Sequence, residues 1–456
     1  MGKEEISRRD FMRRTSTAAG AALVGKSVLL DAEAITASPR PVPPSETVRF
    51  GMVGIGMQGS GLLGISIKLP GVECVAACDL YDGRHVLANA IISRETGKTV
   101  PVTRRYQELL ENKDIDCIVA AVPDHWHERI IVDACNAGKD IYCEKPMTHE
   151  VREGFSIIDA ARKNKRIVQI GSQRRSSIIF AKAKELIDAG AIGEVRLIED
   201  TSGRNSPCGA WVYPPPPDLS TQNLDWGTWQ GSAPKHPFSP IRFARWRGFR
   251  DYGEGLPGDL YVHLLTGIHY IMGVTAPPER AYSVGGLFQW KGDGRDYPDQ
   301  MSTVYEYPSF RCMIRVTLDN SEGEVVRVLG TRGTIEIRGE QVSVSHQDGQ
   351  DHSPCYYASS FPPKLHAEYV KEWEARHTVA PGTAQPIEAS SFHAPPGYDE
   401  DQQHLWNFFQ SVKTRRPSVE DPVFGNNTAI GCHLANYSYF NKTAAVWDEA
   451  ARAIKG

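Results

Sequence analysis

Asp259 and His263 are two residues whose types and spacing fit proton transfer. They stand four positions apart, so on a helix both side chains lie on one face and can point into the same cleft. An imidazole has the unperturbed pKa best suited to removing a proton from an alcohol, and Asp259 could orient it or hydrogen-bond a neighbouring hydroxyl. The ordinary alternative for such a pair is a surface or helix-capping contact. His269, six positions further on, falls away from this face and is expected to be structural.

A glycine-rich turn near residue 54 has the spacing of a dinucleotide-binding loop. An apolar run at 48–53 leads into Gly54-Ile55-Gly56-Met57-Gln58-Gly59. In G-x-G-x-x-G the first glycine permits the tight turn, the second lets the backbone approach a pyrophosphate, and the third lets the helix pack close to the strand. The motif alone also occurs in ordinary turns, so its context matters. We expect cofactor contacts from Gly54, Gly56, Met57, Gln58 and Gly59.

The residues after the second predicted strand bear on the choice of cofactor. The run 73–78 ends at Asp79, about 20 residues beyond the glycines, where an acid can hydrogen-bond the adenosine ribose. This favours NAD. Arg84 could instead meet the 2′-phosphate of NADP, so NADP remains the alternative.

Strand and helix patterns alternate through the first part of the chain. A helix at 106–112, a strand at 117–122, a helix at 128–137 and a strand at 141–143 follow in turn. Such alternation predicts a doubly wound parallel sheet, with the ligand beyond the carboxyl ends of its strands. Asp79, Pro123 and Lys145 all fall at those ends. Lys145, beside the expected nicotinamide, could stabilise a developing alkoxide electrostatically.

Three motifs in this part resemble those of the Gfo/Idh/MocA family, which includes glucose-fructose oxidoreductase and inositol dehydrogenases. They are the glycine turn, the segment 122–127 (Val-Pro-Asp-His-Trp-His) and Glu144-Lys145-Pro146. The segments 171–175, 259–263 and 330–333 also resemble family segments, so the likeness covers about residues 47 to 450. It implies an enzyme that transfers hydride between a nicotinamide cofactor and a ring hydroxyl of a sugar or polyol.

The resemblance also implies roles for individual residues. Pro123, His127, Glu144 and Lys145 would contact the cofactor, and Lys145, Asp259 and His263 would be catalytic. The family often has Gly where Tyr261 stands and a second Asp where Thr266 stands. Because of these differences, the family's substrate contacts do not carry over directly to this sequence. The expected substrate contacts are Gln173, Arg174, Trp229 and Tyr261.

The second half of the chain predicts an α+β domain with a large, mainly antiparallel, open-faced sheet. Its runs of β-branched and aromatic residues lie at 195–199, 281–288, 301–307, 312–318 and 334–338. An irregular loop with prolines at 214–217 and Trp226 and Trp229 could either stack on sugar rings or simply pack. The segment 347–398 is a long insertion that could cover the site or contact another copy. Leu405, Phe409 and Val412 recur at helical spacing and should face the second domain's sheet.

Composition and charge limit the kind of partner. The net charge is −4 and the pI about 6.4, with no long Lys/Arg block outside the extreme N-terminus, which argues against nucleic acid or anionic lipid as partner. The 9 cysteines lack CxxC pairs or zinc spacing, so neither a disulfide framework nor a metal site is expected. We expect a small-molecule substrate and a homo-oligomer.

The N-terminus predicts export. Ser7-Arg8-Arg9-Asp10-Phe11-Met12 is a twin-arginine signature, and the weakly apolar stretch 18–30 that follows is too short and polar to remain in a membrane after processing. The chain thus divides into a signal (1–37), a linker (38–46), a Rossmann domain (47–170) and a substrate domain (171–456). A periplasmic or secreted location follows.

Export also limits the reaction. Because free NAD is scarce outside the cytoplasm, the cofactor should travel bound and be regenerated on the enzyme. A two-substrate redox cycle meets this condition, and so does NAD-dependent glycoside hydrolysis through transient oxidation. A non-catalytic sugar-binding protein is the alternative from another class.

Overall fold

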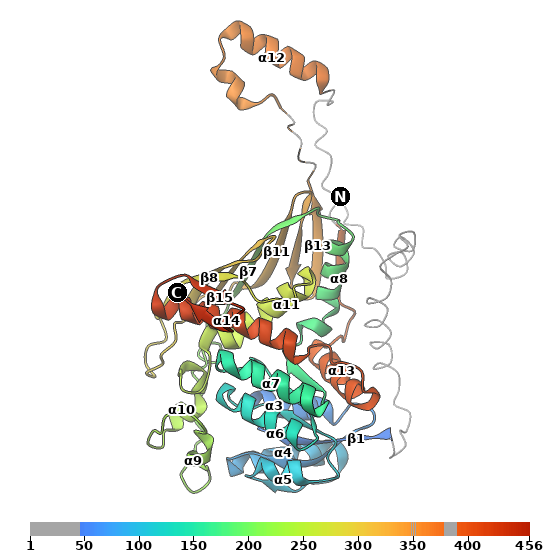
Figure 1. The fold of residues 1–456 in the computed structure, drawn as a ribbon, viewed down its shortest axis with the longest axis vertical. Helices are drawn as coiled ribbons and strands as arrows, with labels where there is room; N and C mark the ends of the chain where they lie inside the picture. Colours follow the sequence, from blue (N-terminus) through green and yellow to red (C-terminus); the bar gives the residue numbers. More distant parts are fainter. Residues whose placement is uncertain (1–45, 348, 350, 352, 378–389) are drawn as a thin grey trace.

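The computed structural model describes residues 46–347, 349, 351, 353–377 and 390–456. The predicted signal, and all of the predicted linker except its last residue, lie outside this part. Two sheets, one above the other in Figure 1, organise the described chain.

The first sheet is parallel throughout, in the order β3-β2-β1-β4-β5-β6. Its strands are β1 (Val48–Val53), β2 (Val72–Cys78), β3 (Val102–Thr103), β4 (Cys117–Ala120), β5 (Asp140–Glu144) and β6 (Val168–Gly171). β4 and β5 are buried along their whole length because helices cover both faces of such a sheet. The predicted doubly wound parallel sheet is confirmed.

Helices connect these strands and cover the sheet (Figure 1). They are α3 (Met57–Ser66), α4 (Asp82–Thr96), α5 (Tyr106–Glu111), α6 (His127–Asn136) and α7 (Val151–Asn164), with the short 3₁₀ turn η2 (Asp124–Trp126) before α6. On one face the apolar side of α6 packs beside α5 and α7, and on the other α3 and α4 pack against β1 and β2.

Helix α13 (Glu400–Thr414) also packs on the parallel sheet. Its residues Leu405, Phe409 and Val412 are buried beside Phe50 of β1, with the Phe50 and Phe409 rings 5.6 Å apart. The expectation that they face the second domain's sheet was wrong. Helical spacing identifies an apolar face but not its partner, and α13 here completes the face of the parallel sheet beside α3.

The second sheet has the order β14-β13-β12-β11-β7-β10-β9-β8-β15-β16. Its strands are β7 (Val195–Gly203), β8 (Arg280–Gly286), β9 (Gln300–Glu306), β10 (Arg311–Thr317), β11 (Gly323–Gly330), β12 (Gly333–Arg338), β13 (Gln341–His346), β14 (Ser390–His393), β15 (Ala445–Asp448) and β16 (Ala453–Lys455). Only the pairing of β7 with β10 is parallel among the described pairs of this sheet. The predicted, mainly antiparallel sheet is confirmed.

One face of this sheet is covered and the other is open. Helices α8 (Ile178–Asp188), α11 (Val262–Met272) and α14 (Pro422–Asn441) bury its inner face. On the outer face, Tyr282, Val304 and Met313 stand side by side on three neighbouring strands and remain exposed. This is the open face that the sequence predicts.

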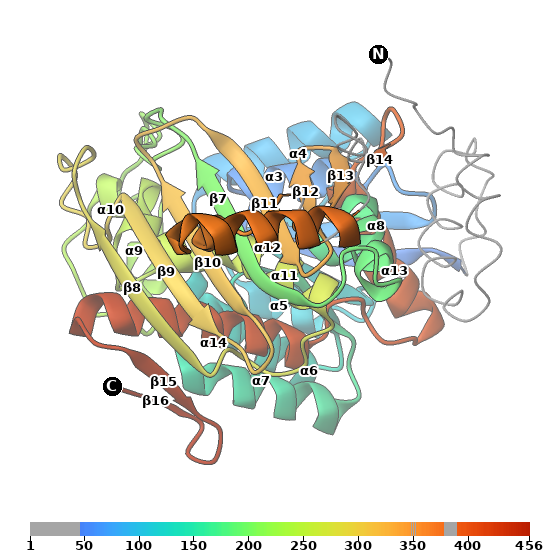
Figure 2. The same ribbon diagram turned by 90° about the horizontal axis from the view of Figure 1, so that it is seen from above.

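Part of the long insertion forms a separate arm. Helix α12 (Pro363–Arg376) follows the 3₁₀ turn η6 (Tyr356–Ser360) and buries none of its residues. In Figure 1 it stands beyond the second sheet, on the side away from the parallel sheet, and in the view from above it overlies the open face (Figure 2). The described part of the insertion therefore does not cover a site between the two sheets.

Residues 204–256, which we call the aromatic segment, leave the second sheet after β7 and return to the parallel one. Leu224 pairs with Tyr81, and the amide of Asp225 donates to the carbonyl of Leu80 over 3.1 Å. Around these contacts Trp226, Trp229 and other rings form a core of their own with Tyr81. The segment includes the short helices α9 (Trp226–Trp229) and α10 (Pro240–Ala244) and the 3₁₀ turn η4 (Trp246–Gly248). It joins the two domains beside the carboxyl end of β2.

Within the described ranges, no helix is both long and apolar enough to cross a bilayer.

Candidate active site

The glycine turn is built as its spacing predicts. Gly54 has φ +82°, and a Cβ there would stand 2.4 Å from the carbonyl oxygen of Ala121. A Cβ on Gly59 would stand 1.9 Å from the carbonyl oxygen of Gly54. Gly56 instead meets nothing closer than the end of the flexible Arg84 side chain, at 3.4 Å. The first and third glycines are therefore required by backbone packing, and the second leaves a passage for a ligand.

Helix α3 begins at this turn and presents free amides to a cavity. Its N-terminus has no side-chain cap, and Gly56, Met57 and Gln58 line a cavity of about 530 Å³ between the two sheets. Unpaired amides and the helix dipole at such an end favour an anion. The turn therefore fits the pyrophosphate of a dinucleotide.

The carboxylate of Asp79 supports the glycine turn through hydrogen bonds to the backbone. It accepts hydrogen bonds from the amides of Ile55, at 2.7 Å, and Tyr81, at 3.0 Å. Arg84 pairs with it at 3.4 Å and, unlike Asp79, lines the cavity. Asp79 thus holds the glycine turn against the end of β2, and Arg84 is the charged side chain that a ligand meets here. The ribose contact predicted for Asp79 remains a prediction.

His127 connects two loops instead of facing the cavity. Its Nδ1 lies 2.6 Å from the carbonyl oxygen of Pro146 and its Nε2 lies 2.9 Å from that of Val122. Burial lowers the pKa of His127 to about 4. Because the imidazole is fully enclosed and does not line the cavity, direct cofactor contact by this side chain is not supported. Pro123, in contrast, lines the cavity as predicted.

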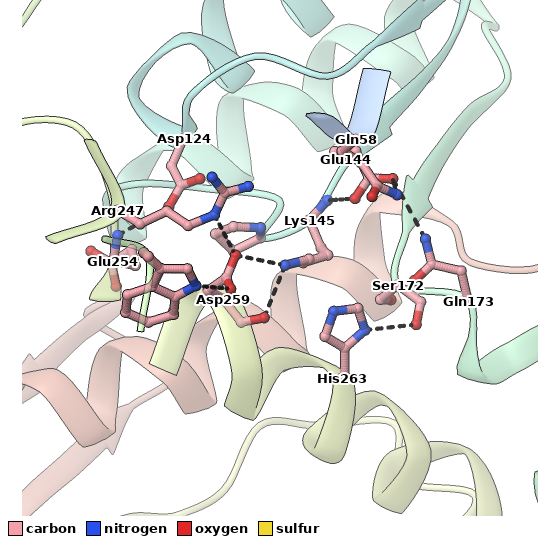
Figure 3. Close-up of polar contacts among 12 residues, drawn as sticks. Gln58, Asp124, Glu144, Lys145, Ser172, Gln173, Arg247, Glu254, Asp259 and His263 are labelled. Carbon is pink, nitrogen blue, oxygen red and sulfur yellow. Dashed lines mark hydrogen bonds and ion pairs between the residues drawn. The ribbon is translucent and has the colours of Figure 1, made fainter. Parts of the chain in front are cut away.

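Glu144 ends β5 in an enclosed position on the cavity wall. Burial raises its pKa to about 7, against the opposing effects of Lys145 and of the Gln58 amide, which donates to it over 3.1 Å. Gln173, whose φ is +58°, turns its amide toward the same carboxylate at 3.5 Å. Glu144 thereby ties the glycine turn to the start of the second domain (Figure 3).

Lys145 and Asp259 form the central ion pair of the site. Nζ of Lys145 donates to Oδ1 of Asp259 over 3.0 Å and to its backbone carbonyl over 2.9 Å. Arg247 donates to the same Oδ1 over 2.8 Å, and the indole of Trp211 donates to Oδ2 over 3.0 Å. Although burial works against ionisation, Lys145, Arg247 and Arg204 hold the pKa of Asp259 well below its usual range. Asp259 is therefore a charged group that fixes Lys145 (Figure 3).

His263 lines the cavity on the other side of Lys145. Its Nδ1 lies 3.3 Å from the carbonyl oxygen of Ser172, which favours the neutral tautomer that donates from Nδ1 and leaves Nε2 as an acceptor. Burial, with the positive charges of Lys145 and Arg174, lowers its pKa well below 6.5. Nε2 hydrogen-bonds no described residue, so it is available as a base.

Asp259 does not orient His263. Asp259 lies in a π-helical turn, η5 (Pro257–Tyr261), and α11 follows directly with His263 in its first turn. Both residues line the cavity, as their spacing predicts. The four-residue spacing cannot say which partners are nearer, and Asp259 bonds Lys145, Arg247 and Trp211, with no hydrogen bond to His263 in the described structure. The orienting group for the imidazole is the backbone of Ser172.

Residues 48–172 match the family model GFO_IDH_MocA, described as "Oxidoreductase family, NAD-binding Rossmann fold". This stretch is similar to the NAD-binding Rossmann domain of that family. The matched residues include the glycine turn, Glu144 and Lys145.

Curated relatives match over about a third of the chain. Inositol 2-dehydrogenase of Salmonella typhimurium is 34% identical over 154 residues, which are 33% of this chain and 45% of that protein. Alpha-N-acetylgalactosaminidase of Shewanella oneidensis is 30% identical over 177 residues, 35% of this chain and 38% of that protein. The match thus spans less than half the length of these relatives.

Solved structures match over most of the chain. Levoglucosan dehydrogenase in complex with NADH and levoglucosan superposes with TM-score 0.64 and 16% identity, covering 87% of this chain and 98% of the other. Aldose-aldose oxidoreductase from Caulobacter crescentus gives TM-score 0.62 and 15% identity, covering 88% and 99%. These likenesses show that the second domain shares its fold with them.

The structure places the predicted substrate residues in different surroundings. Gln173 and Arg174 line the cavity, where Arg174 pairs with Glu324 at 2.8 Å and Glu400 at 2.9 Å. Trp229 reaches the cavity wall but is nearly buried. Its indole stacks on Trp226 with centroids 4.8 Å apart, so packing is its main role.

Tyr261 is not a substrate contact in this structure. Its side chain is fully buried and its hydroxyl donates to the carbonyl of Met301 over 2.7 Å. Tyr261 stands two positions after Asp259, and its side chain points into the hydrophobic core of the second domain because the helix turns it toward the sheet. His269 is likewise buried, with Nε2 2.8 Å from the hydroxyl of Tyr307, in line with its expected structural role.

Sequence reasoning missed Arg204, Trp211 and Arg247. All three line the cavity and surround Asp259. They belong to the aromatic segment. Neither their residue types nor their spacing from Asp259 form a motif with it, so no sequence pattern connects them to Asp259. The one available signal is the density of Arg and Trp at 245–250, Arg-Trp-Arg-Gly-Phe-Arg. Among the described residues, no cluster of His, Cys, Asp or Glu could hold a metal ion.

Proposed function

We propose that this protein is an NAD-dependent oxidoreductase that acts on a ring hydroxyl of a sugar or polyol. The observation that carries the proposal is that Lys145 and His263 line the same cavity as Gly56 and Gln58 of the NAD-binding domain. The glycine turn would hold the dinucleotide, and a base and a cation line the same cavity. The dehydrogenases among the similar proteins support a polyol or sugar as the substrate class.

The residues divide the chemistry between them. When bound, NAD accepts the hydride from the carbon that bears the reacting hydroxyl. Nε2 of His263 removes the hydroxyl proton, since its imidazole is neutral and Nδ1 is directed to Ser172. Nζ of Lys145 stabilises the developing alkoxide, and Asp259, together with Arg247, fixes that ammonium group. In the reverse direction each group performs the opposite step.

We further propose that NAD stays bound through the catalytic cycle and that the protein is exported through its twin-arginine signal. The aromatic segment, which packs against Leu80 and Tyr81 beside the carboxyl end of β2, supports slow cofactor exchange. Export supports it independently, because a cofactor carried inside the folded protein needs no supply outside the cytoplasm.

The test begins with the protein as purified. Denaturation should release NAD in about equal amount to protein. Mixing the holoenzyme with single sugars and polyols under single-turnover conditions should then give the fluorescence of bound NADH. The Lys145→Ala variant, with the same NAD content, is the matched control and should show little reduction. Holoenzyme that reduces no NAD with any sugar or polyol would refute the proposal and favour a binding protein.

A second reaction, glycoside hydrolysis through transient oxidation, is favoured by the similarity to a protein named alpha-N-acetylgalactosaminidase. There the same His263 and Lys145 would begin and end a redox cycle that labilises the glycosidic bond. Aryl glycosides distinguish the two reactions. Release of the aryl alcohol with no net NADH would select the hydrolase, whereas NADH formation without release selects the oxidoreductase.

A further inference from the structure

Three cationic side chains converge on the single carboxylate of Asp259. Lys145 and Arg247 donate to its Oδ1 at 3.0 and 2.8 Å, and an Nη of Arg204 lies 3.6 Å from its Oδ2. Lys145 and Arg247 satisfy Asp259 together with the indole of Trp211. Asp259 already has these partners without Arg204, so Arg204 adds a further positive charge beside it.

The guanidinium of Arg204 hydrogen-bonds no residue in the described part of the chain. Arg204 follows β7 directly, lines the cavity, and lies over the face of Trp211 at 5.7 Å. Its Nε and Nη2 are enclosed by protein and hydrogen-bond no described residue, while the side chain as a whole is 39% exposed. A guanidinium withdrawn from water without acceptors costs free energy. An anion supplied from the cavity would offset that cost.

Nearby acidic groups do not neutralise this end of the cavity. Asp124 faces Arg247 from the NAD-binding domain, but it is buried, which raises its pKa well above the ordinary value. Glu254 pairs with His433 at 3.0 Å. Glu324 and Glu400 on the cavity wall pair with Arg174. Burial raises the pKa of the other two wall acids, Glu144 to about 7 and Asp401 to about 6. The cavity therefore has an excess of positive charge around Asp259.

We propose that the substrate is an acidic sugar, whose carboxylate binds Arg204 while a hydroxyl of the same ring lies between Lys145 and His263. This inference rests on the proposed oxidoreductase function and names its substrate class. Lys145 and Arg204 approach opposite oxygens of one carboxylate, so one sugar ring can span them. Arginine pairs favourably with carboxylates, and Trp211 beneath the guanidinium keeps it directed to the cavity.

Matched substrates test the proposal on the holoenzyme. D-Glucuronate should be oxidised with a higher kcat/KM than D-glucose or D-glucuronamide, which has the same shape without the charge. In Arg204→Gln, the ratio of kcat/KM for glucuronate to that for glucuronamide should fall roughly 10- to 100-fold, as expected for a hydrogen bond to a charged group. Arg196→Gln, at an exposed position near the start of β7, should leave the ratio unchanged. NAD content and melting temperature check that Arg204→Gln folds.

Several outcomes would overturn the inference. A wild-type preference for glucose or for glucose 6-phosphate would do so, and so would an unchanged ratio in Arg204→Gln. Should neither sugar be oxidised, the wider screen of sugars and polyols decides the oxidoreductase function, and calorimetric binding to the holoenzyme still decides the present point. Glucuronate that binds no more tightly than glucuronamide would then refute the acidic-sugar assignment by itself.

Discussion

Nζ of Lys145 lies 3.0 Å from Oδ1 of Asp259 and 2.9 Å from the carbonyl oxygen of the same residue. Lys145 follows the last residue of β5 in the NAD-binding domain, whereas Asp259 lies in the π-helical turn of the second domain. The pair therefore fixes the ammonium group that we propose to be catalytic and joins the two domains at the cavity. π-Helical turns are frequent at functional sites, and here the turn directs both a carbonyl and a carboxylate to one lysine.

Replacing Lys145 with Ala should lower kcat by roughly 10²- to 10³-fold, the usual effect of removing one group that stabilises a developing oxyanion. Asp259 keeps Arg247 and Trp211 as partners, so the fold and the NAD content should persist. Single-turnover NADH formation measures the loss. Lys145→Arg, which retains the charge but changes its geometry, should recover only part of the rate. Normal turnover in Lys145→Ala would move the active site elsewhere.

Replacing His263 with Ala should lower the rate of hydride transfer by about 10²- to 10⁴-fold, the usual contribution of a general base. NAD binding should change little, because the glycine turn lies on a different domain. His346, exposed at the end of β13, is the matched control, and His346→Ala should behave as wild type. A wild-type single-turnover rate in His263→Ala would exclude this histidine as the base.

The pH profile tests the same assignment in the wild-type protein. The base must be neutral, and burial with nearby cations lowers the pKa of His263 well below 6.5. The rate should therefore be constant at neutral pH and fall only in acid, at an apparent pKa below 6.5. Measured kcat across pH 4 to 8 decides the point, and a rate that still rises steeply through pH 7 would contradict it.

The raised pKa of Glu144 predicts a pH-dependent contribution to the free energy of unfolding. The folded pKa of this side chain is raised to about 7 from 4.5 by burial, so between these pH values the unfolded chain loses a proton that the folded chain keeps. The stabilising effect of the protonated form is present below about pH 4.5 and is lost as the pH rises to 7. The free energy of unfolding falls by up to about 3 kcal/mol over this range. In Glu144→Gln this contribution is absent.

Thermal unfolding at pH 5 and pH 8 measures this contribution. The fall in melting temperature from pH 5 to pH 8 should be larger in the wild type than in Glu144→Gln. Equal slopes for the two proteins would mean that Glu144 is already ionised in the folded state.

The cellular location of a variant protein tests the export role of the paired arginines in the predicted signal. Replacing Arg8 and Arg9 with Lys should retain the protein in the cytoplasm, since the pathway reads the arginine pair. Cell fractionation with an activity assay measures it. Normal appearance of the double variant outside the cytoplasm would remove the twin-arginine assignment and with it one argument for a resident cofactor.

Local patterns predicted the parts of the site that lie close together in sequence. The glycine turn, the strands that alternate with helices, and the common face of Asp259 and His263 all follow from short-range spacing. The contacts of Asp259 could not be predicted, because Lys145 comes from the NAD-binding domain and Trp211 and Arg247 come from two different parts of the aromatic segment. For the same reason Tyr261 was misplaced: its neighbours Met301 and Ile314 belong to strands that arrive later in the chain.

The strands of the parallel sheet are synthesised before those of the second sheet, yet one face of the parallel sheet is completed by α13, late in the sequence. At about 5–20 residues per second, the ribosome needs roughly 20–70 s to pass from β1 to that helix. Throughout this time Phe50 and Met52 lack part of their cover, so the nascent NAD-binding domain depends on chaperones or on its own partial structure. The parallel sheet consequently reaches its final packing only after most of the chain has been synthesised.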